Sequence, residues 1–374
     1  MPAIANNDRK NGKQESNLKQ YVRSDDDLEM ALRYLEKKRF QDVIEKLNEN
    51  KIEIAGFYHS SKWQNHWESV IAEQLKLVDG NRFRVVGQHL KWGNRLWTSL
   101  LEISKYFQMT VAGTKLDYEN ITAFVHTLDL KNRNKIALIN APTVPRSAYR
   151  YGDAEKKKEL RKLSKEFNLT EGEYFTFDSA HRYCRQQRNE GKNSYIYYFH
   201  SKGTTYPKKS KSPVSDWRDE MNAFNLEFPS TCLRALLNGY STCGVEYQDA
   251  HYSGNYWWAN CSHVASLPGL WDPIDNAYAC EYFIFNVSRH QHKNADFGRH
   301  CGFNPFHCNI NHYNEACPRE KYIPTILNLL SSENLPISPT QKLKIDVKDT
   351  CGNLAAKPYL SNKKEWDSGK NFFE

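Results

Sequence analysis

The sequence predicts an α/β fold, in which a largely parallel sheet is covered by helices on both faces. Short, continuous apolar runs such as Ile136-Ala137-Leu138-Ile139 are typical of strands that are buried on both sides. Amphipathic helical segments alternate with these runs along the chain, which favours an α/β architecture. The mean hydropathy is low at −0.78, but aromatic residues make up 13% of the chain, a content that disordered proteins lack.

The two ends of the chain differ from its centre. Residues 1–23 are polar and predict a disordered tail. In residues 24–50, Ser24 and three aspartates form a helix start. Apolar residues follow at helical spacing in two sets, at 28, 31, 32 and 35 and at 40, 43, 44 and 47. We expect two short amphipathic helices that pack on the main body as a helical appendage.

The main domain is expected to span residues 51–330, followed by a polar C-terminal tail, 331–374. Periodicity and turn residues predict its elements in order. The expected strands are 52–58, 83–86, 135–140 and 194–199, and the expected helices are 63–77, 96–107, 154–167, 179–189, 217–226 and 231–237.

The net charge, the N-terminal residues and the cysteine content limit the function and the cellular compartment of the protein. The net charge of +8 suits anionic partners, but because the basic residues are interleaved with acidic ones it also suits mere solubility. The first 20 residues lack an apolar leader, and no run of about 18 apolar residues occurs, so we expect a cytoplasmic protein without a transmembrane segment. In that reducing compartment, most of the nine cysteines should be free thiols.

The first candidate for chemistry follows the aromatic strand 194–199, which ends in His200-Ser201-Lys202-Gly203. Ligands of open α/β sheets bind outside the carboxyl ends of strands. Histidine and lysine supply donors for a phosphate there, and glycine permits close backbone approach. The alternative is a surface turn with a stray cation.

Two further segments add polar and aromatic groups. Asp216-Trp217-Arg218 precedes His251-Tyr252-Ser253-Gly254-Asn255-Tyr256-Trp257-Trp258, where paired indoles beside Gly and Asn predict a flat wall for a sugar. Core packing of the indoles is the alternative. Glu281 enters an apolar run, which is costly for a carboxylate without a task or a partner. The alternative for Glu281 is a salt bridge.

Taken in order, these motifs resemble those of a group of glycosyltransferases found in algae, protists, bacteria and large algal viruses. The matching segments are Tyr198 to Gly203, Asp216 to Met221, His251 to Ala259, and Glu281. Phe57-Tyr58-His59 and Gly172-Glu173-Tyr174 also fit, so the likeness covers about residues 51–290.

The resemblance implies a GT-A-like (Rossmann-like) mixed sheet flanked by helices, a nucleotide-sugar donor, and a glycan or other hydroxyl acceptor, as in glycan biosynthesis by hexosyl- or pentosyltransferases. Where many GT-A enzymes carry an Asp-x-Asp motif, this sequence has His200, Lys202 and Gly203, and we expect His200 and Lys202 to offset charge on the departing diphosphate. Glu281 would deprotonate the acceptor, with inversion of the anomeric centre. No Asp-x-Asp motif follows the strand, so a divalent metal ion, Mn²⁺ or Mg²⁺, has no assigned ligand. The residues expected to bind donor or acceptor are Tyr58, His59, Gly203, Trp217, Arg218, His251, Ser253, Gly254, Asn255, Trp257 and Trp258.

Three alternatives stay open on the sequence alone. Cys301, His307, Cys308 and His312 are close enough to share one zinc ion, although their spacing matches no standard zinc frame. The basic run 208–211 could bind nucleic acid, but it is short and more typical of a solvated flap, so no nucleic-acid partner is expected. The chain could also be a relative that binds a sugar without transferring it.

Overall fold

A computed structural model describes the chain from residue 25 to residue 332, with gaps. The described residues are 25–61, 66–80, 98–144, 155, 158, 162, 170–171, 173–202, 213–248, 251–252, 254–268, 279–285, 300–303 and 315–332.

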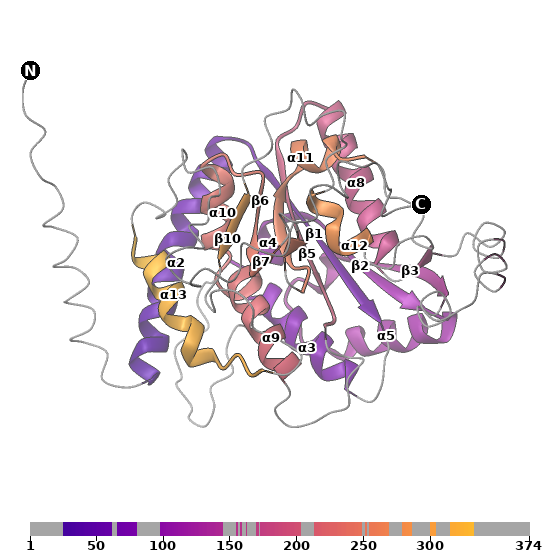
Figure 1. The fold of residues 1–374 in the computed structure, drawn as a ribbon, viewed down its shortest axis with the longest axis horizontal. Helices are drawn as coiled ribbons and strands as arrows, with labels where there is room; N and C mark the ends of the chain where they lie inside the picture. The colour runs from indigo at the N-terminus through magenta and orange to yellow at the C-terminus, as the bar shows by residue number, and fades with distance from the viewer. Residues whose placement is uncertain are drawn as a thin grey trace, which may run out of the picture.

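An eight-stranded sheet in the order β10-β6-β9-β5-β1-β2-β3-β4 forms the centre of the molecule (Figure 1). The two-residue β4 pairs only with the last two residues of β3, so seven strands make up the body of the sheet. The strands are β1 Glu53–Ser61, β2 Ser104–Gly113, β3 Ile136–Val144, β4 Thr170–Glu171, β5 Ser194–His200, β6 Thr242–Val245, β9 Trp257–Asn260 and β10 His300–Phe303. A separate two-stranded sheet pairs β7 Tyr247–Gln248 with β8 His251–Tyr252.

The sheet is mixed because one strand runs against the others. Strand β1 pairs in parallel with both β2 and β5, and β6 pairs in parallel with β10. Strand β9 is antiparallel to both β5 and β6. The carboxyl ends of all strands except β9 therefore lie along one side of the sheet, which we call the carboxyl edge. The predicted α/β fold, with a mixed sheet between helices, is confirmed.

Helices cover both faces of the sheet, each over its own apolar cluster. One face packs against α2 Asp25–Glu49, α3 Trp67–Val78, α5 Lys115–Thr127, α10 Ser230–Leu237 and α13 Arg319–Ser331. The opposite face packs against α8 Tyr174–Asn189, α11 Cys261–Ser266 and the 3₁₀ turn η3 Phe283–Phe285. The remaining elements are α4 Leu100–Ile103, η1 Arg133–Lys135, α9 Pro213–Asn222, the π-helical turn η2 Ala223–Glu227 and α12 Ala279–Tyr282.

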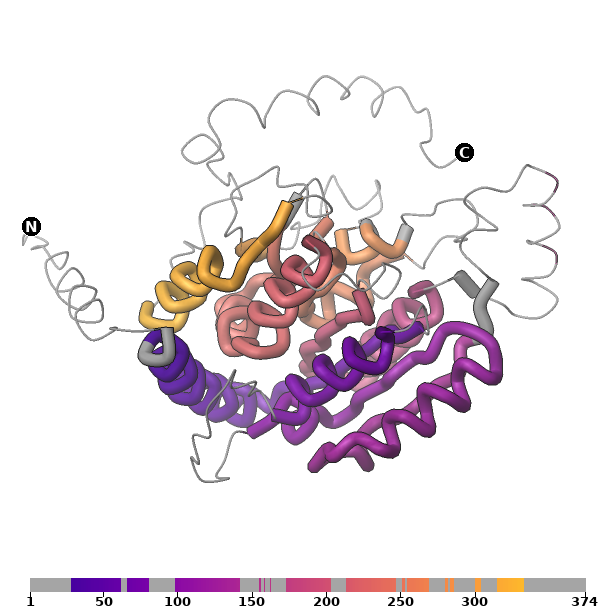
Figure 2. The backbone as a smooth tube through the Cα atoms, turned by 90° about the horizontal axis from the view of Figure 1, so that it is seen from below, coloured from indigo at the N-terminus to yellow at the C-terminus, as the bar shows by residue number. Residues whose placement is uncertain are grey.

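The N-terminal segment is one helix of 25 residues, so the prediction of two short helices is wrong. The residues between the two apolar sets, Glu36 to Arg39, include neither glycine nor proline, so nothing interrupts the helix. The segment packs on the main body as expected: the backbone N–H and the hydroxyl of Ser230 donate to the Glu36 carboxylate. Helix α13 lies beside α2 (Figure 2). Arg319, the first residue of α13, donates to the Glu29 carboxylate of α2.

The helix predicted at 96–107 is also wrong. Only Leu100–Ile103 is helical, opened by a capping box between Ser99 and Glu102. Ser104 ends it by donating its hydroxyl to the carbonyl of Leu100 at 2.6 Å. The following residues pair with β1 as strand β2, and this tertiary pairing overrides the helical spacing of their apolar residues.

The other predicted elements agree with the structure to within a few residues wherever they are described. The strands at 52–58, 135–140 and 194–199 are β1, β3 and β5. The helices at 63–77, 179–189 and 231–237 are α3, α8 and α10, and 217–226 falls in α9 and η2. The strand at 83–86, most of the helix at 154–167, and the tails at 1–23 and beyond 332 lie outside the described residues.

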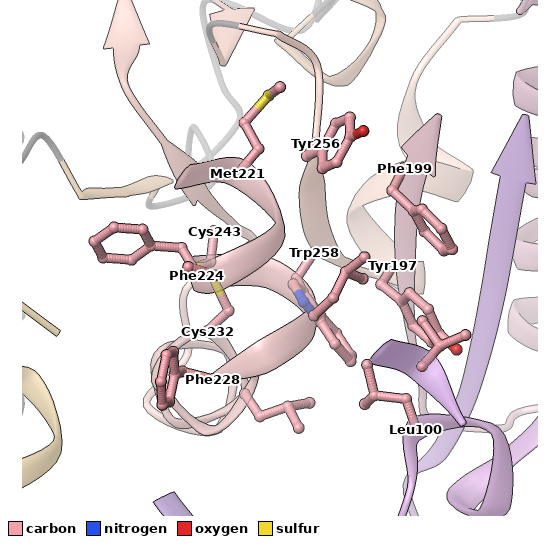
Figure 3. Close-up of a cluster of buried hydrophobic side chains, with 14 of the residues drawn as sticks. Leu100, Tyr197, Phe199, Met221, Phe224, Phe228, Cys232, Cys243, Tyr256 and Trp258 are labelled. Carbon is pink, nitrogen blue, oxygen red and sulfur yellow. A yellow bond between two sulfur atoms is a disulfide. The ribbon is translucent and has the colours of Figure 1, made fainter. Parts of the chain in front are cut away.

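Among the seven cysteines that the structure describes, four form two disulfides, against the expectation that most cysteines are free thiols. Cys184 of α8 joins Cys261 of α11, and Cys232 of α10 joins Cys243 of β6. All four residues are buried. Figure 3 shows the second disulfide within the apolar cluster that also holds Trp258. Each bond fastens a covering helix to a neighbouring element.

No helix among the described residues is long and apolar enough to cross a membrane.

Removing either disulfide should destabilise the fold, and the longer loop should matter more. Loop-closure entropy predicts losses of about 4.5 kcal/mol for the bond that spans 77 residues and about 3 kcal/mol for the bond that spans 11. Guanidinium unfolding of Cys184→Ala/Cys261→Ala and Cys232→Ala/Cys243→Ala under non-reducing conditions measures both. Reductant should lower the stability of the wild type. If thiol titration of the wild type, unfolded without reductant, found the four cysteines of these bonds as free thiols, the two disulfides would be contradicted.

Candidate functional site

The strand order reverses between β1 and β5. From β1 the chain adds β2 and β3 on one side and then returns to place β5 on the other side. In open α/β sheets, ligands bind in the crevice outside the carboxyl ends of the strands at such a switch point. His59 of β1 and His200 of β5 are register partners there. The backbone N–H of Ser201 donates to the carbonyl of His59 at 3.0 Å and ties the two strand ends together.

Side chains at these strand ends alternate between the two faces of the sheet. Tyr58 is fully buried and stacks on Phe199, with ring centroids 4.4 Å apart, in the cluster covered by α3. His59 points to the opposite face, where its Nδ1 lies 3.2 Å from the hydroxyl of Thr176 in α8. The prediction that Tyr58 contacts a ligand is wrong for this structure, because its side chain belongs to the core.

Glu173, at the N-terminus of α8, gathers groups from several segments. Its Oε1 lies 3.2 Å from Nδ1 of His200. Its Oε2 accepts hydrogen bonds from the hydroxyl of Tyr198 at 2.7 Å and from Nδ2 of Asn255 at 2.8 Å. Sequence reasoning did not single out Glu173 as a site residue. The only signal was its place in the Gly-Glu-Tyr segment of the family pattern.

The electrostatics of Glu173 favour its ionised form. Burial by itself raises the pKa of this carboxyl group. The charge and hydrogen bond of His200, the charge of His59 and the hydroxyl of Tyr198 outweigh burial and hold the Glu173 pKa well below its usual range. The N-terminal end of the α8 dipole also favours a negative charge. Glu173 is thus a stable anion about four-fifths removed from solvent.

His200 is held on every side by protein atoms. Its Nδ1 faces Glu173, and its Nε2 lies 2.8 Å from the carbonyl oxygen of Gly254. Its own carbonyl accepts hydrogen bonds from the amide of Gln74 at 3.0 Å and from the hydroxyl of Tyr256. The prediction that His200 donates directly to a phosphate is therefore not supported, since both ring nitrogens are engaged within the protein.

The turn between β8 and β9 fits closely against these groups. The N–H of Asn255 donates to the carbonyl of Tyr252 at 2.8 Å, and Gly254 and Asn255 both have left-handed backbones, with φ of 79° and 61°. A Cβ atom on Gly254 would lie 2.1 Å from the sulfur of Met221. His251 precedes the turn in β8 and is half-buried, whereas Ser253 lies outside the described residues.

Trp257 and Trp258 do not form the predicted sugar-binding wall. Both are fully buried, and consecutive residues of a strand point to opposite faces. Trp258 stacks on Tyr197 at 4.7 Å on one face (Figure 3). Trp257 stacks on Tyr198 at 5.3 Å on the other face. The alternative of core packing is correct for both indoles.

A cationic corner lies beside the turn. The ammonium of Lys202 sits 4.1 Å from the ring centroid of Trp217, a cation–π contact. Arg218 donates to the carbonyl of Lys202 at 3.2 Å and lies 3.9 Å from the carboxylates of Glu73 and Asp219. Trp217 and Arg218 are thereby brought next to Lys202 as the sequence predicts. Gly203 lies outside the described residues.

Glu281 lies in the short helix α12, which reaches the same edge. Nδ2 of Asn255 lies 3.5 Å from the carbonyl oxygen of Cys280, the residue before Glu281, and Glu281 is half-buried. The three predicted segments, after β5, before β9 and in α12, therefore meet around Asn255 and His200.

The residues at the switch point do not suit a divalent metal ion. The strand end carries His200, Ser201 and Lys202, and hard cations prefer carboxylate oxygens to an ammonium group. Across the described ranges, no three His, Cys, Asp or Glu side chains are arranged to hold a metal. Of the zinc candidates, Cys301 is buried in β10, where burial raises its thiol pKa. His307, Cys308 and His312 lie outside the described residues.

A family model described as a domain of unknown function (DUF8361) matches residues 119–281. The match begins within α5 and ends within α12, so it includes Glu173, His200, Lys202 and Glu281 but not β1. Comparison with curated proteins and with solved structures gave no significant match.

Replacing Gly254 tests the fit of the turn against α9. We expect Gly254→Ala to lose at least about 2 kcal/mol of stability, because it adds both left-handed strain and a clash with Met221. Gly191→Ala is the matched control: its φ is 67°, but nothing lies within 4 Å of the added Cβ. Urea unfolding compares the two variants. Equal losses would mean that Met221 does not press on Gly254.

Acid should destabilise the protein partly through His59. Burial is the main cause that lowers the pKa of His59 to about 4, from about 6.5 in the unfolded chain. Between these values only the unfolded chain binds the proton. Stability is therefore full above pH 6.5 and falls as the pH drops to about 4, by at most about 3 kcal/mol. His59→Gln should flatten this slope in urea unfolding measured from pH 8 to 4. A slope identical to that of the wild type would refute the shift.

Proposed function

We propose that the protein is a glycosyltransferase that binds the diphosphate of a nucleotide-sugar donor at the β1–β5 switch point. The observation that carries this proposal is the position of Lys202 directly after β5, at the place where open α/β sheets bind their ligands, with Arg218 of α9 donating to the Lys202 carbonyl. The mixed sheet agrees with the GT-A-like fold that the family resemblance implies. The net charge of +8 agrees with an anionic donor.

Departure of the nucleoside diphosphate leaves negative charge at this edge. Lys202 supplies a positive charge on a flexible stem that rests on Trp217. Positive groups fixed in advance where charge develops lower the barrier without reorganisation. Under this proposal His200 does not contact the diphosphate, because both its ring nitrogens face protein oxygens. Its role is to hold the Gly254 turn in place through Nε2. No step requires a metal ion.

The acceptor hydroxyl must lose a proton as it attacks the sugar. Glu281 is the carboxylate of α12 beside the Asn255 turn and is proposed as the base. Direct attack with this base inverts the anomeric centre. Trp257 and Trp258 take no part in sugar binding under this proposal, since they are buried in the core.

The two disulfides bear on the compartment in which the protein folds, for which the sequence predicts the cytoplasm. Structural disulfides persist mainly in oxidising compartments. The bonds Cys184–Cys261 and Cys232–Cys243 favour folding in such a compartment. The free thiols can be counted in the native protein after alkylation at cell lysis. Oxidised Cys184, Cys261, Cys232 and Cys243 would indicate an oxidising compartment, and reduced ones would indicate the cytoplasm.

Donor binding tests the site directly. In calorimetric titrations with UDP, GDP, ADP and CDP, at least one nucleotide should bind. Lys202→Ala should weaken that binding about ten- to hundredfold, the effect of losing one charged hydrogen bond. Lys192→Ala is the control, because Lys192 precedes β5 at the opposite end of the strand and pairs with Glu190. Equal effects of the two variants would exclude the switch point as the diphosphate site.

Transfer itself is tested with the sugar derivatives of the nucleotide that binds. Glu281→Gln should lower the rate of donor hydrolysis and transfer about 10²- to 10⁴-fold while leaving nucleotide binding unchanged. Full activity in a folded Glu281→Gln protein would remove Glu281 as the base. Binding without any turnover in the wild type would indicate a sugar-binding protein instead.

A further inference from the structure

One charged group at the switch point has no part in the chemistry proposed above. Glu173 is a carboxylate with 20% of its side chain exposed, and it touches His200 and Asn255 rather than Lys202 or Arg218. From the start of α8 it contacts two other parts of the chain, the end of β5 and the turn before β9, and so joins three segments. A group that joins three segments of a site controls their relative positions.

The two ring nitrogens of His200 define what Glu173 does. Nδ1 faces a carboxylate oxygen of Glu173 and Nε2 faces the carbonyl oxygen of Gly254, at 3.2 Å and 2.8 Å. Both partners are acceptors only. Both contacts are hydrogen bonds only when both nitrogens carry a proton, that is, when the ring is a cation. In a neutral ring, one of the two nitrogens carries no proton. Its lone pair would then face a lone pair of the acceptor oxygen, and that hydrogen bond would be lost.

The same carboxylate fixes the turn that His200 contacts. Nδ2 of Asn255 donates to Glu173, while Oδ1 of Asn255 accepts from the indole of Trp257 at 3.1 Å. The side chain of Asn255 therefore has one orientation, and its left-handed backbone is held with it. Gly254 in turn lies against Met221 of α9, the helix that carries Trp217 and Arg218.

We propose that Glu173 is the positioning residue of the candidate site: paired with a doubly protonated His200, it locks the Gly254–Asn255 turn against β5 and so places α9 with its cationic corner. This inference rests on the proposed function for its consequence in donor binding, but its geometry does not depend on the identity of the donor.

Other titratable groups face His200, and they do not supply the pairing charge. His59 of β1 is neutral at neutral pH, because burial lowers its pKa to about 4. Burial raises the pKa values of Tyr198 and Tyr256, so both stay neutral. Among the described residues packed on His200, Glu173 is therefore the one that carries a negative charge.

The ion pair is tested by carboxyl ¹³C NMR on protein labelled at glutamate, with the Glu173 signal assigned by its loss in Glu173→Gln. In the wild type, Glu173 should stay ionised well below the ordinary glutamate pKa of about 4.3. His200→Gln should move its titration up to or above that value. Glu190→Gln, at the far end of α8, should have no effect. A wild-type midpoint at about 4.3 or higher, or no change in His200→Gln, would overturn the proposal.

The consequence for the site is tested by the affinity for whichever of UDP, GDP, ADP and CDP binds the wild type. Glu173→Gln should weaken that binding about tenfold, because the turn and α9 lose their fixed position, whereas Glu190→Gln should leave the affinity unchanged. A Glu173→Gln protein that binds the nucleotide as tightly as the wild type refutes the positioning role. If none of the four nucleotides binds the wild type, diphosphate binding at this site fails, and the carboxyl titration still decides for or against the Glu173–His200 pair.

Discussion

The parallel pairing of β1 with β5 is the constraint on which the rest of the structure depends. It places strands that are far apart in sequence side by side, after the chain has already laid down β2 and β3 on the other side of β1. This reversal opens the edge of the sheet where His59 and His200 end their strands. It also sends α3 to one face and α8 to the other, so that both faces contribute groups to one place.

The charged side chains at the ends of β1 and β5 fall into two groups. One anion, Glu173, is neutralised by His200 and hydrogen-bonded by Tyr198 and Asn255, which meets the cost of taking a carboxylate out of water. The cations that remain, Lys202 and Arg218, lie on the α9 side. The carboxylate–imidazole pair of Glu173 and His200 therefore lies apart from Lys202 and Arg218, an arrangement that pattern and composition do not reveal.

The sequence predicted the strands better than the contacts of the side chains at their ends. An aromatic run ending in His-Ser-Lys predicted a strand, and β5 is that strand. Trp257 and Trp258, beside Gly254 and Asn255, suggested a flat wall for a sugar. Strand geometry instead sends them to opposite faces, where both are buried. Glu173 went unrecognised because its partners are distant in sequence and only the fold brings them together.

What the sequence by itself determined is the local order of the chain: buried strands, amphipathic helices, and the positions of polar groups at strand ends, all of which follow from periodicity and turn residues over a few neighbours. Only the tertiary structure decided that residues 104–107 form a strand, that four cysteines form two disulfides, and that His200 faces Glu173. Each of these depends on contacts between residues widely separated along the chain, and local propensity carries no information about such contacts.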